Sequence, residues 1–232
     1  MLLLYCMTKA DSAAAGAPGV GVGEARLLRA DFVTSGEAGV ACWYSEGGVA
    51  GGAAKDDLLA FHRVVHTFFQ AGAVVPFRFP TTLADTAALS AWLQSNAVAV
   101  ERELERLTGM VQMELHVTAE QDSAKKDSTP SGGREYLEAR RDAQSALREA
   151  AAAARQRVAG LAVEWRERET RAGLRCYALV ARGQEREFAA RIEKIDGSGA
   201  LDLGAAVRVA RVRVTGPWPP AEFLDAALTT PS

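Results

Sequence analysis

A proline-rich segment near the C-terminus constrains the fold more than any other feature of the sequence. Residues 216–220 read Gly-Pro-Trp-Pro-Pro and follow residues 207–215, an alternating run that predicts a strand. Proline fixes φ and lacks a backbone N–H donor, so we expect the sheet ladder to stop at this segment. Gly216 permits a turn conformation that other residues resist. The rigid segment can hold Trp218 and Phe223 in fixed positions.

Composition indicates a folded protein without a strongly charged target. The chain has 232 residues, 48% of them hydrophobic, which can supply ordinary cores. Lysine and arginine number 27 against 29 acidic residues, so the net charge of -2 favours neither nucleic acid nor a membrane surface as a partner. Cys6, Cys42 and Cys176 are odd in number and widely spaced, which argues against disulfides or a zinc site and predicts a cytoplasmic protein. The apolar residues 2–7 are too short to span a bilayer.

The first half of the chain combines strand and helix patterns. We expect strands at residues 2–8, 26–34, 39–45, 74–79 and 111–118. The second and third strands predict a hairpin around residues 35–38, and residues 10–23 predict a loop. Apolar residues at helical spacing predict helices at residues 55–71 and 83–108. In the strand at 111–118 apolar and polar residues alternate, so one face is expected to be buried and the other wet.

A polar run without apolar anchors, residues 120–133, predicts a domain boundary. We therefore expect an N-terminal domain at residues 1–120, a linker at 121–133 and a C-terminal domain at 134–232. The C-terminal domain is expected to begin with a long helix over residues 134–171 unless this breaks near Gly160. The whole pattern predicts an α+β protein with two small sheets covered by helices.

The last elements follow this helix. We expect a strand at residues 174–182, a short helix through Phe188 and Ile192, and the strand that leads into the prolines. The alternation of that last strand slips at Ala210 or Arg211, which predicts a β-bulge. Such a bulge would turn Trp218 and Phe223 back onto the fold, and direct contact with a partner is the alternative.

Three histidines invite a metal hypothesis. His62 and His66 stand four residues apart on one predicted helix, and His116 lies on a predicted strand. No acid or cysteine stands near them at ligand spacing, so packed or rim histidines are the stronger interpretation. The glycine-rich residues 19–23 and 47–52 match no phosphate-binding fingerprint. The sequence also lacks GxSxG and HExxH motifs, and it predicts no catalytic residue, cofactor or metal.

An arginine between two phenylalanines is the remaining candidate. Arg78 lies in the run Val-Val-Pro-Phe-Arg-Phe-Pro-Thr-Thr, residues 74–82. Its planar guanidinium suits a bidentate phosphate or carboxylate contact. It equally suits a structural cation–π contact or ion pair beside Phe77 and Phe79. Both interpretations stay open.

Five segments, in order, make the chain resemble the GvpF/GvpL family of gas vesicle proteins. They are residues 3–6, the His62 helix leading into Pro76-Phe77-Arg78-Phe79, the strand with Glu114 and Val117, residues 133–137, and Gly216-Pro217-Trp218-Pro219-Pro220. Two positions depart from the family pattern, because Pro80 stands where a glycine is usual and Ala221 where an aromatic residue is usual.

The resemblance implies both a fold and a role. It implies a modified ferredoxin-like N-terminal sheet with helices on one face, followed by a C-terminal α+β domain with a long helix. It also implies a non-catalytic accessory or minor structural protein of gas vesicle assembly, located in the cytoplasm and at the gas vesicle. Its partners would be the main hydrophobic shell protein (GvpA-like) and other accessory proteins. The alternative is a small-ligand-binding or regulatory ferredoxin-like protein in which Arg78 holds an anion.

Overall fold

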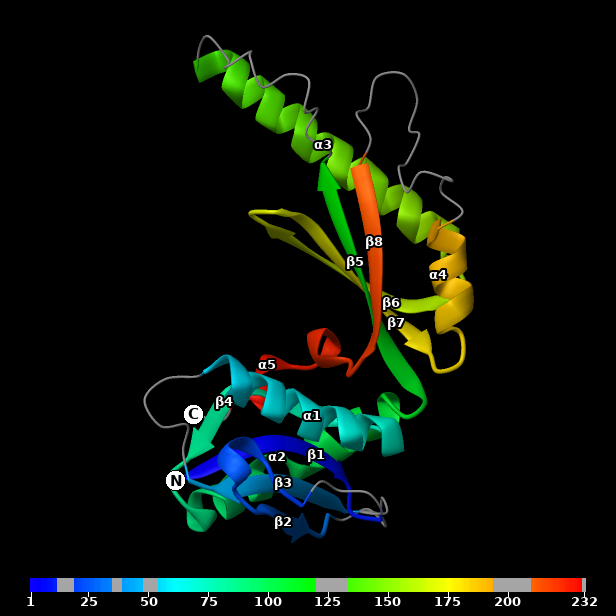
Figure 1. Cartoon of the computed structure of the whole chain (residues 1–232). Coiled ribbons are helices and arrows are strands. Elements are labelled where there is room, and N and C mark those ends of the chain that lie inside the picture. The colour runs from blue at the N-terminus through cyan, green and yellow to red at the C-terminus, as the bar shows by residue number, and fades with distance from the viewer. Residues whose placement is uncertain (12–18, 35–38, 48–53, 120–132, 194–209, 231–232) are drawn as a thin grey trace. The chain divides into compact units, whose positions relative to one another are not determined.

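The chain forms two compact units, each built on its own sheet (Figure 1). The computed structural model describes residues 1–11, 19–34, 39–47, 54–119, 133–193 and 210–230. One unit comprises Met1–Val111 with Trp218–Ser232, and the other comprises Gln112–Pro217. The predicted α+β class with two sheets is confirmed. The division differs from the expected boundaries because it falls within a strand and because the last residues return to the first unit.

The first unit contains a four-stranded sheet in the order β2-β3-β1-β4. Neighbouring strands are antiparallel. Its elements are β1 (Leu2–Lys9), η1 (Val22–Glu24), β2 (Leu27–Phe32), β3 (Val40–Glu46), α1 (Lys55–Ala71), β4 (Val75–Leu83), α2 (Thr86–Arg106), η3 (Ala221–Phe223) and α5 (Ala226–Thr229). The predicted hairpin of β2 and β3 is confirmed, while its expected turn at residues 35–38, and residues 12–18 of the expected loop, lie outside the described residues.

Helices cover both faces of the first sheet, which corrects the expectation of helices on one face. Seven successive residues of β1 and six of β3 are buried, so neither face of these central strands reaches water. Trp43 of β3 packs against Phe68 of α1, with ring centroids 4.4 Å apart. Phe77 of β4 packs edge-on against Trp92 of α2 at 5.6 Å. The continuous apolar runs of β1 and β3 are therefore the sequence signal of a sheet enclosed on two sides.

The second unit has the ferredoxin-like order of elements. Along the chain it runs strand, helix, strand, strand, helix, strand, and its sheet order is β6-β7-β5-β8. Its elements are β5 (Met110–Ala119), α3 (Gly133–Arg157), β6 (Ala162–Thr170), β7 (Gly173–Ala181), α4 (Glu185–Glu193) and β8 (Ala210–Trp218). The first unit, where we expected a modified ferredoxin-like sheet, departs from this order because it begins with three strands before any long helix.

The helix expected over residues 134–171 ends before Gly160, and the residues after it form a strand. α3 ends at Arg157, and β6 pairs antiparallel with β7. Gly160 lies in the intervening turn with a φ of 86°, a left-handed conformation that favours glycine. Glu164 and Arg168, expected as a helical pair, therefore lie on an edge strand. Because charged residues occur on both faces of this strand, its sequence pattern is similar to that of the polar side of an amphipathic helix.

One face of the second sheet is packed against helices. Val158, directly after α3, is buried, and so are small and apolar side chains of α3 and α4: Ala150, Ala151, Ala154, Phe188 and Ile192. In β5 the predicted alternation holds, since Val111, Met113, Leu115 and Val117 are buried and Glu114, His116 and Thr118 are half-buried. Gln112 is the exception, being only 5% exposed. The other face carries the polar residues of β5 together with the buried Tyr177 and Leu179 of β7.

The last strand continues further than predicted. β8 runs through Pro217 to Trp218 rather than stopping at Gly216. β8 lies at the edge of the sheet, where a proline without an N–H donor is tolerated. The predicted bulge rests on residues 207 and 209, which lie outside the described residues.

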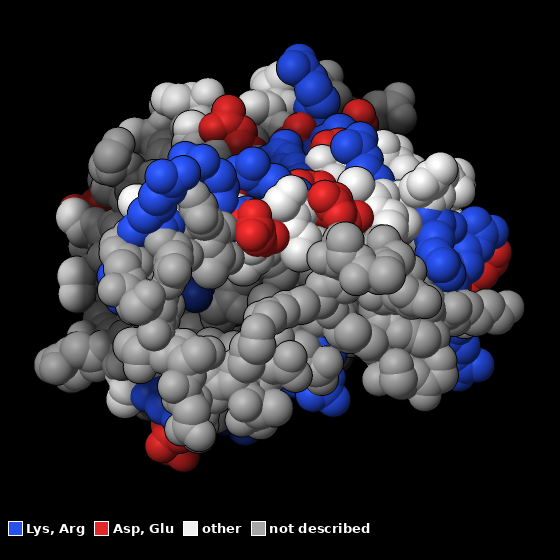
Figure 2. All heavy atoms as spheres, turned by 90° about the horizontal axis from the view of Figure 1, so that it is seen from above, with Lys and Arg blue, Asp and Glu red and all other residues white. Residues whose placement is uncertain are grey.

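Charges are mixed over the surface shown in Figure 2, where acidic and basic side chains lie interspersed among neutral ones. This agrees with 27 basic and 29 acidic residues in the chain. Within the described residues, no helix combines the length and apolar character needed to cross a membrane.

Candidate functional site

The two phenylalanines of the central motif contact different helices. Phe77 is buried against Trp92 of α2. Phe79 is half-buried and packs on Phe61 of α1, with ring centroids 5.1 Å apart. On a regular strand, residues two apart would share a face. The motif therefore ties β4 to both helices of the first unit.

An irregular register explains this divergence. Pro76 pairs with Cys6 of β1 and Thr81 pairs with Leu4, so residues 77–80 lie opposite the single residue Tyr5. The extra residues break the alternation of β4. The peptide bond between Phe79 and Pro80 is cis. Pro80, which departs from the family pattern, thus lies inside the irregular stretch.

Arg78 points neither at an aromatic ring nor at an acid of the described structure. Its side chain is exposed, and no described residue forms a hydrogen bond, ion pair or ring contact with its guanidinium. Its carbonyl accepts a hydrogen bond of 2.5 Å from the Thr81 hydroxyl. Among the described residues no contact supports the structural interpretation of Arg78 beside Phe77 and Phe79, and both interpretations stay predictions.

The three histidines do not form a metal site in the described part of the chain. His62 and His66 are exposed on α1, where His62 stands edge-on to Phe61 at 6.0 Å and His66 lies 3.2 Å from the Gln70 side-chain amide. His116 belongs to the second unit. No group of three metal-ligating side chains occurs among the described residues.

The C-terminal motif divides at the boundary of the units. The Gly216 φ is 129°, and a Cβ there would lie 2.9 Å from the Gln112 carbonyl oxygen, so glycine is required. The Gly216–Pro217 peptide is cis. Trp218 is 43% exposed, whereas Phe223 is 2% exposed. Phe223 thus packs on the fold as expected, while Trp218 keeps much of its surface in water.

Polar contacts hold the C-terminal segment, residues 218–230, on the first unit. Arg106 of α2 donates from Nη2 to the Phe223 carbonyl at 3.0 Å and pairs with Glu103 at 2.6 Å. The Thr81 hydroxyl lies 3.4 Å from the Thr229 carbonyl oxygen. Pro219 is half-buried and Pro220 is buried. The segment therefore lies against the same strand, β4, that carries the central motif.

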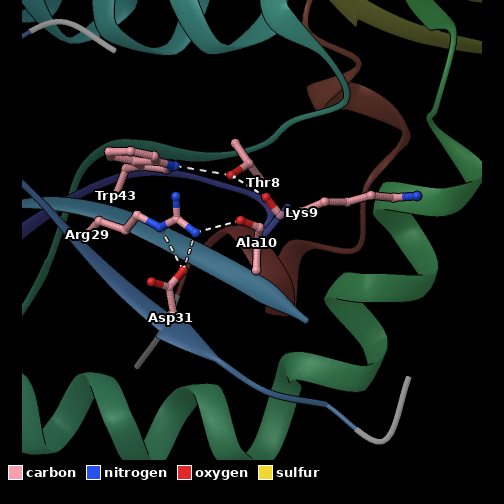
Figure 3. Close-up of polar contacts among 6 residues, drawn as sticks. All are labelled: Thr8, Lys9, Ala10, Arg29, Asp31 and Trp43. Carbon is pink, nitrogen blue, oxygen red and sulfur yellow. Dashed lines mark hydrogen bonds and ion pairs between the residues drawn. The ribbon is translucent and has the colours of Figure 1, made fainter. Parts of the chain in front are cut away.

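A cluster that the sequence did not predict joins β2 to the end of β1 (Figure 3). The Arg29 guanidinium lies 5.5 Å from the Trp43 ring centroid and donates to Asp31 at 2.7 Å and to the Ala10 carbonyl at 2.6 Å. Trp43 in turn donates to the Thr8 hydroxyl at 3.1 Å. Strand register pairs Arg29 with Trp43, and only this long-range pairing reveals the cluster.

Two exposed leucines lie on α1, the helix that carries Phe61. Leu58 is 39% exposed and Leu59 is 49% exposed, one turn of α1 before Phe61 and His62. Phe61 contacts both His62 and Phe79. We call the set Leu58, Leu59, His62, Arg78 and Phe79 the α1–β4 surface. It offers apolar area, a cation and an imidazole to a partner.

The cysteines are unsuited to nucleophilic chemistry. All three thiols are buried. Burial raises the pKa of the Cys42 thiol well above its usual range, and burial, with a smaller contribution from Glu167, raises the pKa of Cys176 to about 12. Because the thiolate is the reactive form, these side chains act as small apolar core residues.

Comparison with known proteins decides the family. The family model described as "Gas vesicle synthesis protein GvpL/GvpF" matches residues 1–225. The chain belongs to the GvpL/GvpF family. The GvpL/GvpF match spans both units and confirms the resemblance that the sequence motifs indicated.

Solved structures share the GvpL/GvpF fold. The gas vesicle protein GvpF of Anabaena sp. PCC7120 is similar with a TM-score of 0.72 and 17% identity, over 96% of this chain and 94% of that chain. GvpF of Microcystis aeruginosa is similar with a TM-score of 0.70 and 16% identity, over 96% and 98% of the two chains. At such identities the likeness shows the fold alone. A search of curated protein sequences finds no match.

Proposed function

We propose that this member of the GvpL/GvpF family is a non-catalytic assembly or minor structural protein that binds the main gas vesicle shell protein during nucleation or growth. The observation that carries the proposal is the family match over residues 1–225. The fold shared with two GvpF structures over almost the whole chain supports it. The protein would act in the cytoplasm and at the growing vesicle, together with other accessory proteins.

The α1–β4 surface is the proposed contact with the shell protein. A hydrophobic shell subunit needs apolar area on its partner, and exposed leucines supply it. Leu58 and Leu59 expose 39% and 49% of their surface on α1, whose Phe61 packs on the half-buried Phe79. Covering such side chains contributes about 25 cal/mol per Å² of apolar area. Arg78, the residue before Phe79, adds a donor for carbonyl or carboxylate groups of the partner.

Genetics and co-purification test the role. Deletion of the gene should abolish or strongly reduce vesicles, and tagged protein should retain the shell protein on an affinity column. A deletion strain that builds normal vesicles would refute an assembly role. Co-purification with other accessory proteins but not with the shell protein would refute the proposed partner while leaving a role in assembly.

Surface variants test the proposed contact. Replacing Leu58 and Leu59 by serine should weaken shell-protein binding by about tenfold, since roughly 1–2 kcal/mol of apolar burial is lost. Val98 on α2 is 56% exposed and serves as a matched control, because Val98→Ser removes exposed apolar area elsewhere on the same unit. Equal binding by the Leu58→Ser, Leu59→Ser protein and the control would place the contact elsewhere.

A ligand screen with and without Arg78 distinguishes the proposed assembly role from a small-ligand-binding role. Its guanidinium has no partner among the described residues, which is the observation that favours an anion site. A thermal-shift screen of nucleotides, phosphate and divalent metals should give no Arg78-dependent stabilisation. A strong shift that Arg78→Ala abolishes would favour the ligand-binding alternative.

A further inference from the structure

Along residues 166–169 of β6, acidic and basic side chains lie on opposite sides of the sheet. Glu169 pairs with Arg148 of α3 at 2.7 Å and accepts a hydrogen bond from Gln144 at 2.8 Å, so it lies on the helix-covered side of the sheet. Side chains alternate along a strand. Arg166 and Arg168 therefore lie on the opposite, open side. Because both sides of this edge strand are exposed, folding alone does not require the arginines to share one side.

The neighbouring strands continue the same pattern. Register places Arg168 directly opposite Arg175 of β7, so both lie on the open side. Arg175 contacts Glu114 of β5 at 3.2 Å, and His116 contacts the same carboxylate oxygen at 3.0 Å. Like charges directly opposite one another destabilise a sheet. The chain tolerates this cost here, where Arg168 also lies over the Tyr177 ring at 5.3 Å.

The edge strand β8 adds two more arginines. A Cβ on Gly216 would lie 3.0 Å from the Met113 sulfur, so Gly216 is on the helix-covered side, where Met113 is buried. Alternation then places Arg211 and Arg213 on the open side. Both are exposed, as expected for that side, while the intervening Val212 is half-buried.

Five arginines thus share the open side of the second sheet, which we call the basic face: Arg166, Arg168, Arg175, Arg211 and Arg213. By the same alternation the described strands place two carboxylates there, Glu114 and Glu164. The whole chain carries a net charge of -2, so this positive excess is local. An open sheet face with such an excess attracts an anionic partner.

We propose that the basic face binds an acidic segment of a partner protein, with arginine side chains on carboxylates. The planar guanidinium matches a carboxylate bidentately. Sheets of this topology that bind single-stranded nucleic acid stack bases on exposed aromatic rings. On this face the aromatic ring among the described residues, Tyr177, is 3% exposed and lies beneath Arg168. Carboxylates are therefore favoured over nucleotides.

Fluorescence anisotropy with a labelled deca-glutamate peptide tests the proposal on the full chain. Replacing Arg211 and Arg213 by serine should weaken binding by about tenfold at low salt, as expected for the loss of two exposed ion pairs. Arg140 and Arg141 are exposed on α3 and serve as the control pair, because Arg140→Ser, Arg141→Ser gives the same charge change elsewhere on this unit. The control should lose less than about twofold.

A charge reversal completes the test. Arg211→Glu with Arg213→Glu should abolish deca-glutamate binding and create binding to a deca-lysine peptide. Absence of deca-glutamate binding by the unmodified protein, or equal losses in both serine variants, would refute the proposal. Tighter, Arg211-dependent binding of a ten-residue oligothymidylate would assign the face to nucleic acid instead. The Leu58→Ser, Leu59→Ser protein should bind deca-glutamate normally, which separates this inference from the proposed shell contact.

Discussion

Gly21 offers the sharpest test of how the first unit is packed. Tyr5 is fully buried, its ring stacks on Phe61 at 5.3 Å, and its hydroxyl contacts Ser45 at 3.0 Å and accepts a 2.8 Å hydrogen bond from the Val22 N–H. A Cβ on Gly21 would lie 2.0 Å from that hydroxyl oxygen and 2.7 Å from the ring carbon that bears it. Gly21→Ala therefore forces the turn at residues 19–25 away from Tyr5.

The energetic cost depends on the contacts that this movement breaks. Leaving the Val22 N–H and the Tyr5 hydroxyl without their hydrogen bond costs about 1–3 kcal/mol in a buried site. Partial exposure of the Val22 side chain, now 8% exposed, adds about 1 kcal/mol. We expect a loss of roughly 2–4 kcal/mol, or about 4–16 °C in Tm for a chain of this size.

Urea unfolding followed by circular dichroism measures the effect, and Gly19→Ala is the control. A Cβ on Gly19 meets nothing within 4 Å, so this change should shift stability by less than about 0.5 kcal/mol. In a Tyr5→Phe background Gly21→Ala should cost less, because the closest clashing atom is gone. If Gly21→Ala proved as stable as Gly19→Ala, the close approach to Tyr5 would be refuted.

Three further outcomes are expected from burial and charge. Phe223→Ala should cost about 3–5 kcal/mol and Trp218→Ala clearly less, because Phe223 is buried and Trp218 is 43% exposed; equal losses in thermal denaturation would contradict this. Native protein at pH 8 should react with a thiol reagent at Cys176 only after unfolding, since burial raises its pKa to about 12; rapid labelling of the folded chain would refute the buried thiol. Hydrogen bonds from Arg148 and Gln144 lower the Glu169 pKa. The unmodified protein should therefore be more stable than Arg148→Ala at pH values above the ordinary carboxyl range, and this difference should disappear as the pH falls through the lowered pKa. A difference in urea midpoints that does not depend on pH would exclude this linkage.

Local sequence patterns predicted those helices and strands that bury one side along their whole length. α1 has the predicted bounds, because Phe61, Val65 and Phe68 recur at helical spacing on one buried side. The alternation of β5 likewise reflects one helix-covered and one open side. β6 was not predicted, because its charged side chains are exposed on both faces of an edge strand. Such residues show no alternation of buried and exposed positions that would distinguish a strand from a helix. Only Gly160 signalled the change, and a glycine that ends a helix does not specify whether the next element is a strand or a second helix.

The sequence motifs can be identified without a structure, but their geometry cannot. The sequence motifs identified Phe77, Phe79 and Trp218, yet local alternation puts both phenylalanines on one face. The irregular pairing of β4 with β1, which sends them to different helices, depends on a partner strand about 70 residues earlier in the chain. The return of Phe223 to the first unit is equally non-local, since an apolar residue does not specify which distant surface it covers.

The interruption of the first unit by the second has a consequence during synthesis. The ribosome produces α1, β4 and α2 long before residues 218–230, because Gln112–Pro217 intervenes. At about 5–20 residues per second, the interval is on the order of ten seconds. Throughout it, the nascent first unit lacks Phe223, Leu224 and Leu228, which are buried in the finished protein. The growing chain therefore holds an incomplete core while the ferredoxin-like unit emerges, and it is in this interval that chaperone binding would matter most.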